Sequence, residues 1–403
     1  MGARIECGGH KDSLLLEAGL VIVSPGVAVE EKWKEAASRK GIEIIGELEF
    51  AYRSCGADVI AVTGTNGKTT VSTLIYEILK TKYGEKVFLA GNVGVPFSEK
   101  APGSKKGDIA VIEASSFQLE TIKDFRSRIA VILNITEDHL DRHPSMQAYA
   151  EAKANIFRNQ WEKDHLVLNA DDRFTNIMNS MSKSVKVHFS VSRALNDGYY
   201  LENGVLVKNV FGKKQPLFPV EEMLIKGPHN AENALAAMIV SDIMKIPGED
   251  AARVIRAFKG LPHRMEAVGE FNGKKYYDDS KATNIDAVIK AVKTFTEPLA
   301  LILGGREKGT DFKPLLDVLS PNVKLIIALG ENRDKIESVF SGRFKVVKTE
   351  SMKDAVAAAD AEQGITAVLL SPGCASFDLF KNYAHRGSEF RKFAERINDA
   401  KRN

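Results

Sequence analysis

The sequence contains few cysteines, and this scarcity excludes several kinds of protein. Cys7, Cys55 and Cys374 are the only three among 403 residues, and they lie far apart. An odd number of widely spaced cysteines provides neither a disulfide framework nor a zinc site of clustered thiolates. The pattern is typical of reduced thiols, so we expect a cytoplasmic protein.

Long apolar runs are also missing. No stretch approaches the about 20 apolar residues that a membrane-spanning helix requires. The first residues, MGARIECGGHKDSLL, lack the apolar segment that a secretory signal places between its basic end and its cleavage site. We therefore expect no membrane association.

An excess of one charge is the third missing feature. The chain has 56 basic and 53 acidic residues and a net charge of +3, which argues against binding to nucleic acid through a basic face. The chain is long: 403 residues are more than a single domain with one hydrophobic core usually contains, so we expect two or three domains.

Apolar strand-like runs alternate with amphipathic helical runs along most of the chain. DVIAVTG, DIAVIEASS and LALILGG are examples of the strand-like runs. Strands that are apolar throughout are buried on both faces, so the pattern predicts α/β domains with parallel sheets. Turns and short strands are expected between about Lys183 and Val220, and the alternation resumes after LPHRMEAVGEFNGKKYYDDSK. Boundaries near Tyr52 and Leu261 give an N-terminal piece (1–51), a central domain (52–260) and a C-terminal domain (261–403).

The stretch VIAVTGTNGKTTVSTL predicts a phosphate-binding loop. A strand, a glycine-rich turn and a helix start form an anion site, because backbone N–H groups converge there at the positive end of the helix dipole. Lys68 would neutralise the β- and γ-phosphates of a nucleotide, and the Thr69 hydroxyl would reach Mg²⁺. A longer form of this loop has a glycine at the position where this chain has Val62, so the match is to the shorter form. The residues expected to bind ATP are Gly64, Thr65, Asn66, Gly67, Lys68, Thr69 and Thr70.

The segment TGTNGKTT resembles the Mur ligases, the ATP-dependent amide-forming enzymes of peptidoglycan synthesis. EASSFQLE, NITEDHLDRH, GPHNAENALAA, GLPHRMEAV, DDSKATN and LSPGCASFDLFKNYAHRG follow in the same order. The likeness runs from about Gly19 to the end and is greatest to members that add D-glutamate to UDP-N-acetylmuramoyl-L-alanine. It implies a truncated N-terminal Rossmann-like piece, a central P-loop mononucleotide-binding domain and a C-terminal Rossmann-like domain.

The resemblance also implies the reaction and its ligands. ATP phosphorylates the carboxylate of the sugar nucleotide, and the amine of D-glutamate then attacks the acyl phosphate. Two Mg²⁺ sites, a monomer and small-molecule partners alone are expected. The implied catalytic residues are Lys68, His139, Lys153 and Arg264, and the implied metal ligands are Thr69, Glu113, His139 and Lys153.

Three of these residues have plainer alternatives. Glu113 follows an apolar strand and could instead cap a helix, and His139 could be an ordinary polar loop residue. In the family the lysine that matches Lys153 is carbamylated by CO₂, which replaces an ammonium that would repel Mg²⁺ by two oxygen ligands. An exposed helix lysine is the alternative for Lys153.

The remaining implied contacts belong to the nucleotide and the two substrates. The residues that match ATP contacts in the family are Asn230, Arg264 and Asp279. Two of them have alternatives: Asn230 could cap a helix, and Arg264 could merely pair with Glu266 on the surface. GGREKG, which contains Lys308, could be only a glycine-rich loop. The residues expected at D-glutamate are Lys281, Thr283, Lys308, Ser376 and Phe377, and those expected at the UDP-sugar are Ser24, Pro25, Gly26 and Asn92.

The start of the chain departs from the family pattern. The first part of the N-terminal domain, which grips the UDP group in the family, has no counterpart before Ser24. We therefore expect normal ATP binding and weak UDP-sugar binding. An ATP-binding protein with impaired ligase activity stays open as an alternative, whereas a folylpolyglutamate synthase is disfavoured by SSFQLE and DSKATN.

Overall fold

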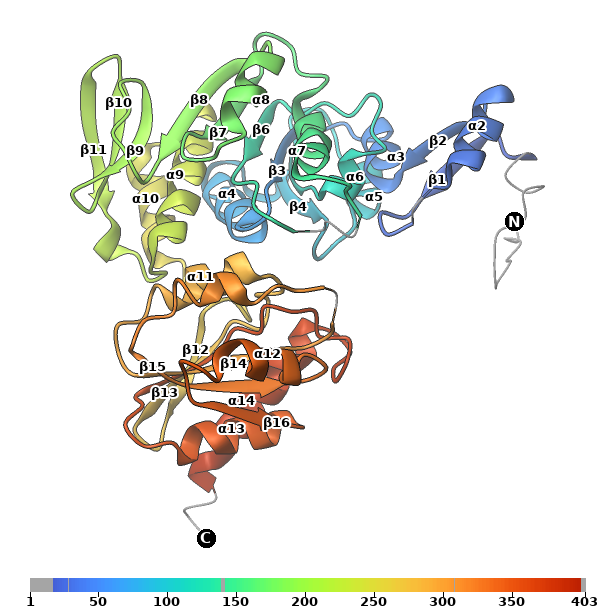
Figure 1. Cartoon of the computed structure of the whole chain (residues 1–403). Helices are drawn as coiled ribbons and strands as arrows, with labels where there is room; N and C mark the ends of the chain where they lie inside the picture. Colours follow the sequence, from blue (N-terminus) through green and yellow to red (C-terminus); the bar gives the residue numbers. More distant parts are fainter. Residues whose placement is uncertain (1–16, 28, 139–141, 308, 400–403) are drawn as a thin grey trace. The chain divides into compact units, whose positions relative to one another are not determined.

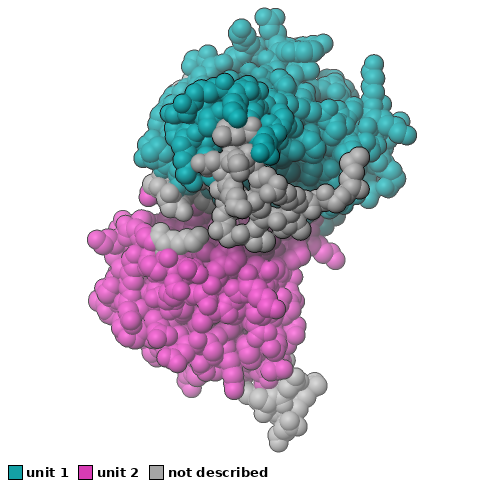
Figure 2. Space-filling model, turned by 90° about the vertical axis from the view of Figure 1, so that its right-hand side faces the viewer, with its two compact units in different colours: residues 1–135, 142–222, 231–257 teal, residues 136–141, 223–230, 258–403 magenta. Residues whose placement is uncertain are grey.

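The computed structural model describes residues 17–27, 29–138, 142–307 and 309–399. Two compact units divide the chain, one containing residues 1–135, 142–222 and 231–257, and the other residues 136–141, 223–230 and 258–403 (Figure 2). Cys7, His139 and Lys308 lie outside the described residues. No helix in the described ranges is long and apolar enough to cross a lipid bilayer.

The first unit is built on a nine-stranded sheet with the order β11-β10-β9-β8-β7-β6-β3-β5-β4 (Figure 1). Neighbours from β4 to β9 are parallel, and β10 is antiparallel to both of its neighbours, β9 and β11. The strands are β3 (Asp58–Thr63), β4 (Val87–Gly91), β5 (Ile109–Glu113), β6 (Ile129–Ile132), β7 (His165–Asn169), β8 (Val185–Ser190), β9 (Gly198–Glu202), β10 (Val205–Val210) and β11 (Lys213–Pro219). Every residue of β5 and β6 is buried, which confirms the expected parallel strands covered on both faces.

Helices cover both faces of this sheet. They are α3 (Glu47–Arg53), α4 (Lys68–Tyr83), α5 (Phe97–Lys100), α6 (Ser116–Leu119), α7 (Met146–Ala154), α8 (Thr175–Met181), α9 (Pro228–Ile243) and α10 (Gly248–Ala257). Apolar residues of the strands and helices form one core cluster that includes Leu48, Val59, Phe97 and Tyr149. The predicted pause in the α/β alternation corresponds to the run of short strands from β8 to β11, which have no helix between them.

The N-terminal segment adds a small two-stranded sheet to this unit. β1 (Leu20–Val23) and β2 (Glu43–Gly46) are parallel and are connected through α2 (Glu31–Arg39). The turn after β1 is closed by a hydrogen bond from the Val27 N–H to the Ser24 carbonyl, 2.9 Å long.

A buried carboxylate joins α3 to the rest of the unit. Glu49 is 0% exposed, and its two oxygens accept hydrogen bonds of 2.9–3.1 Å from the backbone N–H groups of Lys123, Asp124 and Phe125. The Arg53 guanidinium donates to the same carboxylate at 3.0 Å. A buried anion is stable only when it is hydrogen-bonded in this way, so the position requires a carboxylate.

Replacing Glu49 with glutamine is expected to lower the free energy of unfolding by about 1.5–3 kcal/mol, because the hydrogen bonds of Glu49 would lose the charge on their acceptor. Denaturant titration followed by circular dichroism measures this change. Glu99→Gln on α5, at an exposed glutamate, is the matched control. Equal stabilities of the two variants would show that the contacts of Glu49 contribute nothing.

The second unit contains a six-stranded sheet with the order β12-β13-β17-β14-β15-β16. All neighbours are parallel except β12 and β13, which form an antiparallel edge. The elements are β12 (Glu266–Phe271), β13 (Lys274–Asp278), α11 (Ile285–Val292), β14 (Leu299–Leu303), β15 (Val323–Leu329), α12 (Arg333–Phe340), β16 (Val346–Thr349), α13 (Met352–Ala361), β17 (Ala367–Leu370) and α14 (Tyr383–Asp399).

The β12–β13 hairpin was not expected from the sequence. Its tip is the pair Asn272 and Gly273, both with positive φ (53° and 73°), which is the conformation of a tight two-residue hairpin turn. The interruption in the α/β alternation before residue 281 is therefore an antiparallel edge of the second sheet.

Candidate active site

The glycine-rich loop has the expected strand–turn–helix form. β3 ends at Thr63 and α4 begins at Lys68, and the turn between them contains Gly64 with φ 153° and Gly67 with φ 88°. A Cβ on Gly67 would lie 2.5 Å from Oδ1 of Asn233 and would stand on a backbone with φ 88°, so a larger residue there would be strained. The turn thus leaves its backbone N–H groups at a helix N-terminus, where anions bind.

Asn134, two residues after β6, holds this loop in place. The Asn66 N–H donates to Oδ1 of Asn134 at 2.8 Å, and Nδ2 of Asn134 donates to the Asn66 carbonyl at 3.1 Å. The Thr65 N–H also donates to the Asn134 carbonyl at 2.8 Å. Sequence reasoning missed this role, although Asn134 closely follows a buried apolar strand, where ligand-binding residues of parallel sheets gather.

Two lysines meet at one carbonyl of the loop. Nζ of Lys68 donates to the carbonyls of Gly64 and Thr65 at 2.9 and 2.8 Å, and Nζ of Lys153 donates to the Gly64 carbonyl at 2.9 Å. Lys153 is 1% exposed, and its Nζ lies 4.5 Å from the centroid of the Tyr149 ring. The alternative of an exposed helix lysine is therefore wrong.

Glu113 ends β5, which pairs with β3, and it is almost fully buried. Its Oε1 accepts a hydrogen bond from Nδ2 of Asn92 at 3.0 Å, so the predicted UDP-sugar residue Asn92 lies beside the predicted metal ligand. The N-cap of α6 is Ser115, which rules out the helix-capping alternative for Glu113.

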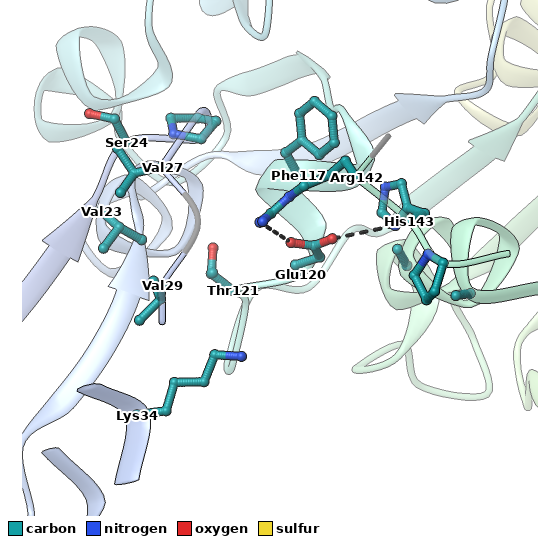
Figure 3. Close-up of a pocket in the computed structure, with 14 residues that line it drawn as sticks. Val23, Ser24, Val27, Val29, Lys34, Phe117, Glu120, Thr121, Arg142 and His143 are labelled. Carbon is teal, nitrogen blue, oxygen red and sulfur yellow. Dashed lines mark hydrogen bonds and ion pairs between the residues drawn. The ribbon is translucent and has the colours of Figure 1, made fainter. Parts of the chain in front are cut away.

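A cavity of about 440 Å³ lies between the turn after β1 and the helices α6 and α7 (Figure 3). Ser24 and Pro25 line it, and Gly26 follows them in the same turn. Of the predicted UDP-sugar residues, Ser24 and Pro25 thus line this cavity, whereas Asn92 lies apart from them beside Glu113. Sequence reasoning missed the charged residues of the wall, which are Lys34, Glu120 and Arg142.

In the second unit Asp279 follows β13 and is buried. Its Oδ2 accepts from the Ser371 hydroxyl at 2.8 Å, and its Oδ1 accepts from the Met265 N–H at 3.3 Å. Burial raises the pKa of Asp279 to about 7, against the lowering effect of the Ser371 hydroxyl. The carboxyl therefore binds a proton near neutral pH more readily than an ordinary aspartate does.

The backbone around Arg264 is constrained on both sides. His263 and Met265 have positive φ values of 62° and 46°, which are unusual for residues with side chains. The carboxylate of Glu266 accepts from the Arg391 guanidinium at 2.6 Å and from the His263 N–H at 2.9 Å. Glu266, which the alternative interpretation paired with Arg264, is thus bound to Arg391.

Four of the five residues predicted at D-glutamate follow two neighbouring strands of the second sheet, and the fifth, Lys308, lies outside the described residues. Lys281 and Thr283 follow β13, and Ser376 and Phe377 follow β17, its parallel neighbour. Ser376 is buried, Phe377 is exposed, and Nζ of Lys281 lies 3.7 Å from the centroid of the Tyr383 ring. The carboxyl ends of neighbouring parallel strands meet at one edge, so we expect these four residues to lie in one region.

A buried arginine that sequence reasoning missed connects the loops after β13 and β17. The guanidinium of Arg386 donates to the Ser280 hydroxyl at 2.9 Å, to the Ser280 carbonyl at 2.8 Å and to the Cys374 carbonyl at 3.0 Å. Burial lowers its pKa to about 10. The segment NYAHRG, already part of the family resemblance, was the available signal.

One local expectation is wrong. Asn230 does not cap α9, because the helix already begins at Pro228 and Asn230 lies in its first turn. Its Nδ2 donates to the carbonyl of Lys226 at 2.8 Å. The contact of Asn230 with a nucleotide stays a prediction, as do the domain boundaries at residues 51 and 260.

Comparisons with known proteins agree with these features. The family described as "Mur ligase middle domain" matches residues 62–241, and the one described as "Mur ligase, glutamate ligase domain" matches residues 263–374. A protein of Alkaliphilus metalliredigens named UDP-N-acetylmuramoylalanine--D-glutamate ligase is 40% identical over 396 residues, which cover 97% of this chain and 87% of the relative. A protein of the same name from Caldicellulosiruptor bescii is 42% identical over 393 residues, which cover 96% and 85%.

Solved structures share the fold at lower sequence identity. The MurF ligase from Thermotoga maritima in complex with ADP has a TM-score of 0.64 at 17% identity and covers 96% of this chain and 99% of its own. A pseudomurein peptide ligase type C from Methanothermus fervidus has a TM-score of 0.62 at 19% identity and covers 98% and 89%. These likenesses concern the fold alone.

Proposed function

This chain belongs to the Mur ligase family, in the group of UDP-N-acetylmuramoylalanine--D-glutamate ligases, and we propose that it joins D-glutamate to UDP-N-acetylmuramoyl-L-alanine with ATP as co-substrate. The observation that best supports this chemistry is the glycine-rich turn, whose Gly64 carbonyl accepts hydrogen bonds from both Lys68 and Lys153. The product is a peptidoglycan precursor.

The reaction must turn a poor electrophile into a reactive one. Transfer of the γ-phosphoryl group of ATP to the L-alanyl carboxylate gives an acyl phosphate, and the amine of D-glutamate attacks its carbonyl carbon. The tetrahedral intermediate then loses phosphate, and the amide bond remains. The Lys68 ammonium and the N–H groups of the loop neutralise charge on the phosphates, which is the main contribution that a protein makes to phosphoryl transfer.

The residues of the first unit fit the expected Mg²⁺. The Thr69 hydroxyl starts α4, and the buried Glu113 carboxylate ends β5, so both offer the oxygen ligands that Mg²⁺ prefers. When bound, Mg²⁺ would neutralise charge on the phosphate oxygens. We infer that Glu113 and Thr69 serve one metal site and that Lys153, as a carbamate, serves a second; His139, which lies outside the described residues, stays a predicted ligand.

The two substrates are assigned to different units. The cavity lined by Ser24 and Pro25 is the proposed site of the sugar nucleotide, because its volume of about 440 Å³ accommodates part of a large ligand. The edge formed by Thr283, Ser376 and Lys281 is the proposed site of D-glutamate. We infer a cytoplasmic enzyme from its precursor substrates; the monomeric state and the lack of a nucleic-acid partner stay predictions.

A single assay tests the proposed function. Conversion of ATP to ADP is measured with the full chain in the presence of UDP-N-acetylmuramoyl-L-alanine, D-glutamate, both or neither. Strong turnover only with both substrates is the expected result. Turnover that is independent of them would instead identify an ATP-binding protein without ligase activity.

Lys308 and Thr283 are expected to set the affinity for D-glutamate. A lysine–carboxylate hydrogen bond in a closed site contributes about 1.5–3 kcal/mol, so Lys308→Ala should raise the KM for D-glutamate about ten- to a hundredfold. Thr283→Ala should raise the same KM by a smaller factor, because its hydroxyl carries no charge. Initial rates at varied D-glutamate and varied ATP measure both constants. An equal rise in the KM for ATP would place Lys308 at another ligand.

A further inference from the structure

The wall of the cavity beside β1 contains an ion pair, between Glu120 and Arg142, to which the proposed reaction assigns no role. Glu120, on the segment after α6, and Arg142, before α7, face the cavity and contact each other (Figure 3). Building on the proposed function, we propose that Arg142 recognises the diphosphate of the sugar nucleotide, and that Glu120 holds its guanidinium at the wall until the diphosphate competes for it.

Arg142 is accessible to a ligand and yet held in a defined place. Its NH2 group lies 2.9 Å from Oε2 of Glu120, and the side chains of the two residues are 33% and 29% exposed. The guanidinium carbon lies 5.8 Å from the centroid of the Phe117 ring, so the group is also supported from the side. The guanidinium can therefore exchange one anionic partner for another without first leaving a buried position.

Glu120 keeps a second partner when Arg142 turns away. Its Oε1 lies 3.5 Å from Nδ1 of His143, while Nε2 of His143 is hydrogen-bonded at 3.0 Å to the hydroxyl of Ser116. The buried His143 ring is stacked on Phe117 with an interplanar angle of 13° and a centroid distance of 5.6 Å. Glu120 thus keeps the His143 imidazole as a neighbour when Arg142 turns away, and this contact is an ion pair when the imidazole is protonated.

The charge and shape of the wall favour a diphosphate over a neutral ligand. The charged residues that line the cavity are two cations, Lys34 and Arg142, and one anion, Glu120, and the Lys34 ammonium is also paired with Glu31 at 3.0 Å. An arginine presents a planar set of N–H donors that matches two phosphate oxygens at once, which is why it is common at phosphate sites. Ser24 and Pro25, assigned to the sugar nucleotide on separate grounds, line the same cavity.

The test compares wild type with Arg142→Met and Arg142→Lys in the full chain. Initial rates give the KM for UDP-N-acetylmuramoyl-L-alanine, D-glutamate and ATP, and calorimetric titrations with UDP and with inorganic pyrophosphate measure binding without catalysis. We expect Arg142→Met to raise the KM for the sugar nucleotide and the Kd values for UDP and pyrophosphate about ten- to a hundredfold. Arg142→Lys should recover part of the loss, because it keeps the charge without the planar fork.

Two further variants complete the design. Arg253→Met removes another ion-paired arginine, which lies on α10, does not line the cavity and has a 68% exposed side chain. It should change none of the constants. Glu120→Gln removes the competing carboxylate and should keep or tighten pyrophosphate binding. Melting curves confirm that each variant is folded.

The outcomes separate this inference from the proposed function. If wild type ligates and Arg142→Met keeps the wild-type KM for the sugar nucleotide, the role of Arg142 is refuted and the ligase assignment stands. If wild type forms no product, the ligase assignment fails, and the titrations still decide: equal pyrophosphate and UDP binding by wild type and Arg142→Met refutes the role of Arg142. A uniform rise of all three KM values would also refute it, because a diphosphate contact affects one substrate.

Discussion

Lys68→Ala is expected to lower the rate of ligation by at least about a thousandfold while the protein stays folded. The Lys68 ammonium starts α4 and lies within hydrogen-bond distance of the loop carbonyls of Gly64 and Thr65, where the β- and γ-phosphates are expected. Removing one group that stabilises charge in a transition state commonly costs a factor of about 100 to 1,000. Loss of phosphate binding adds to this, so the combined effect is the largest that we expect.

The control for this experiment lies on the same helix. Lys82 is in the last turn of α4, and its Nζ donates to the carbonyl of Lys245 at 3.0 Å, away from the loop. Lys82→Ala should ligate at close to the wild-type rate. Release of ADP measures both variants, and thermal melting tests the fold. Similar turnover of Lys68→Ala and Lys82→Ala would remove Lys68 from the catalytic residues.

Lys153→Ala is expected to abolish most activity and, unlike Lys68→Ala, to be partly rescued by formate or acetate. In the proposed carbamylation the neutral Lys153 amine would attack CO₂, a nitrogen–carbon bond would form, the nitrogen would lose a proton, and a carbamate anion would result. Its two oxygens suit Mg²⁺, whereas the ammonium would repel the metal. Because Lys153 is 1% exposed, the carbamate would be protected from bulk water, and a small carboxylate could occupy the space that alanine leaves.

Mass spectrometry of the intact protein with and without bicarbonate detects the modification directly. Activity should rise with bicarbonate for wild type and stay independent of it for Lys153→Ala. Lys80→Ala, at an exposed lysine of α4, controls for nonspecific loss of charge. Full activity of Lys153→Ala, or a wild-type mass that bicarbonate never changes, would contradict the carbamate.

The glycine-rich loop could be predicted from the sequence because every part of its signal is local. A buried strand, two glycines, a lysine and a helix follow one another within residues 59–74, and the structure contains them in that order. The parallel strands could be predicted for the same reason, since an apolar run such as β5 needs cover on both faces.

Contacts between distant segments could not be predicted. The hydrogen bonds between Asn134 and Asn66 form because β6 lies next to β3, and no local sequence pattern specifies this order of strands. The burial of Lys153 arises from packing of α7 beside the loop, whereas a lysine in a helix is usually exposed. The β12–β13 hairpin is different, because Asn272 and Gly273 are a recognisable turn pair that was overlooked.

The Gly64 carbonyl accepts hydrogen bonds from both Lys68 and Lys153, and this shared acceptor has a thermodynamic consequence. If Lys153 is carbamylated and Lys68 contacts the nucleotide, as proposed, CO₂ addition at one amine and nucleotide binding at the other would form a linked pair of equilibria. Reciprocity requires that CO₂ changes the affinity for the nucleotide by the same factor by which the nucleotide changes the affinity for CO₂. The supply of dissolved carbon dioxide would then act as an effector of ATP binding, transmitted through a single peptide oxygen.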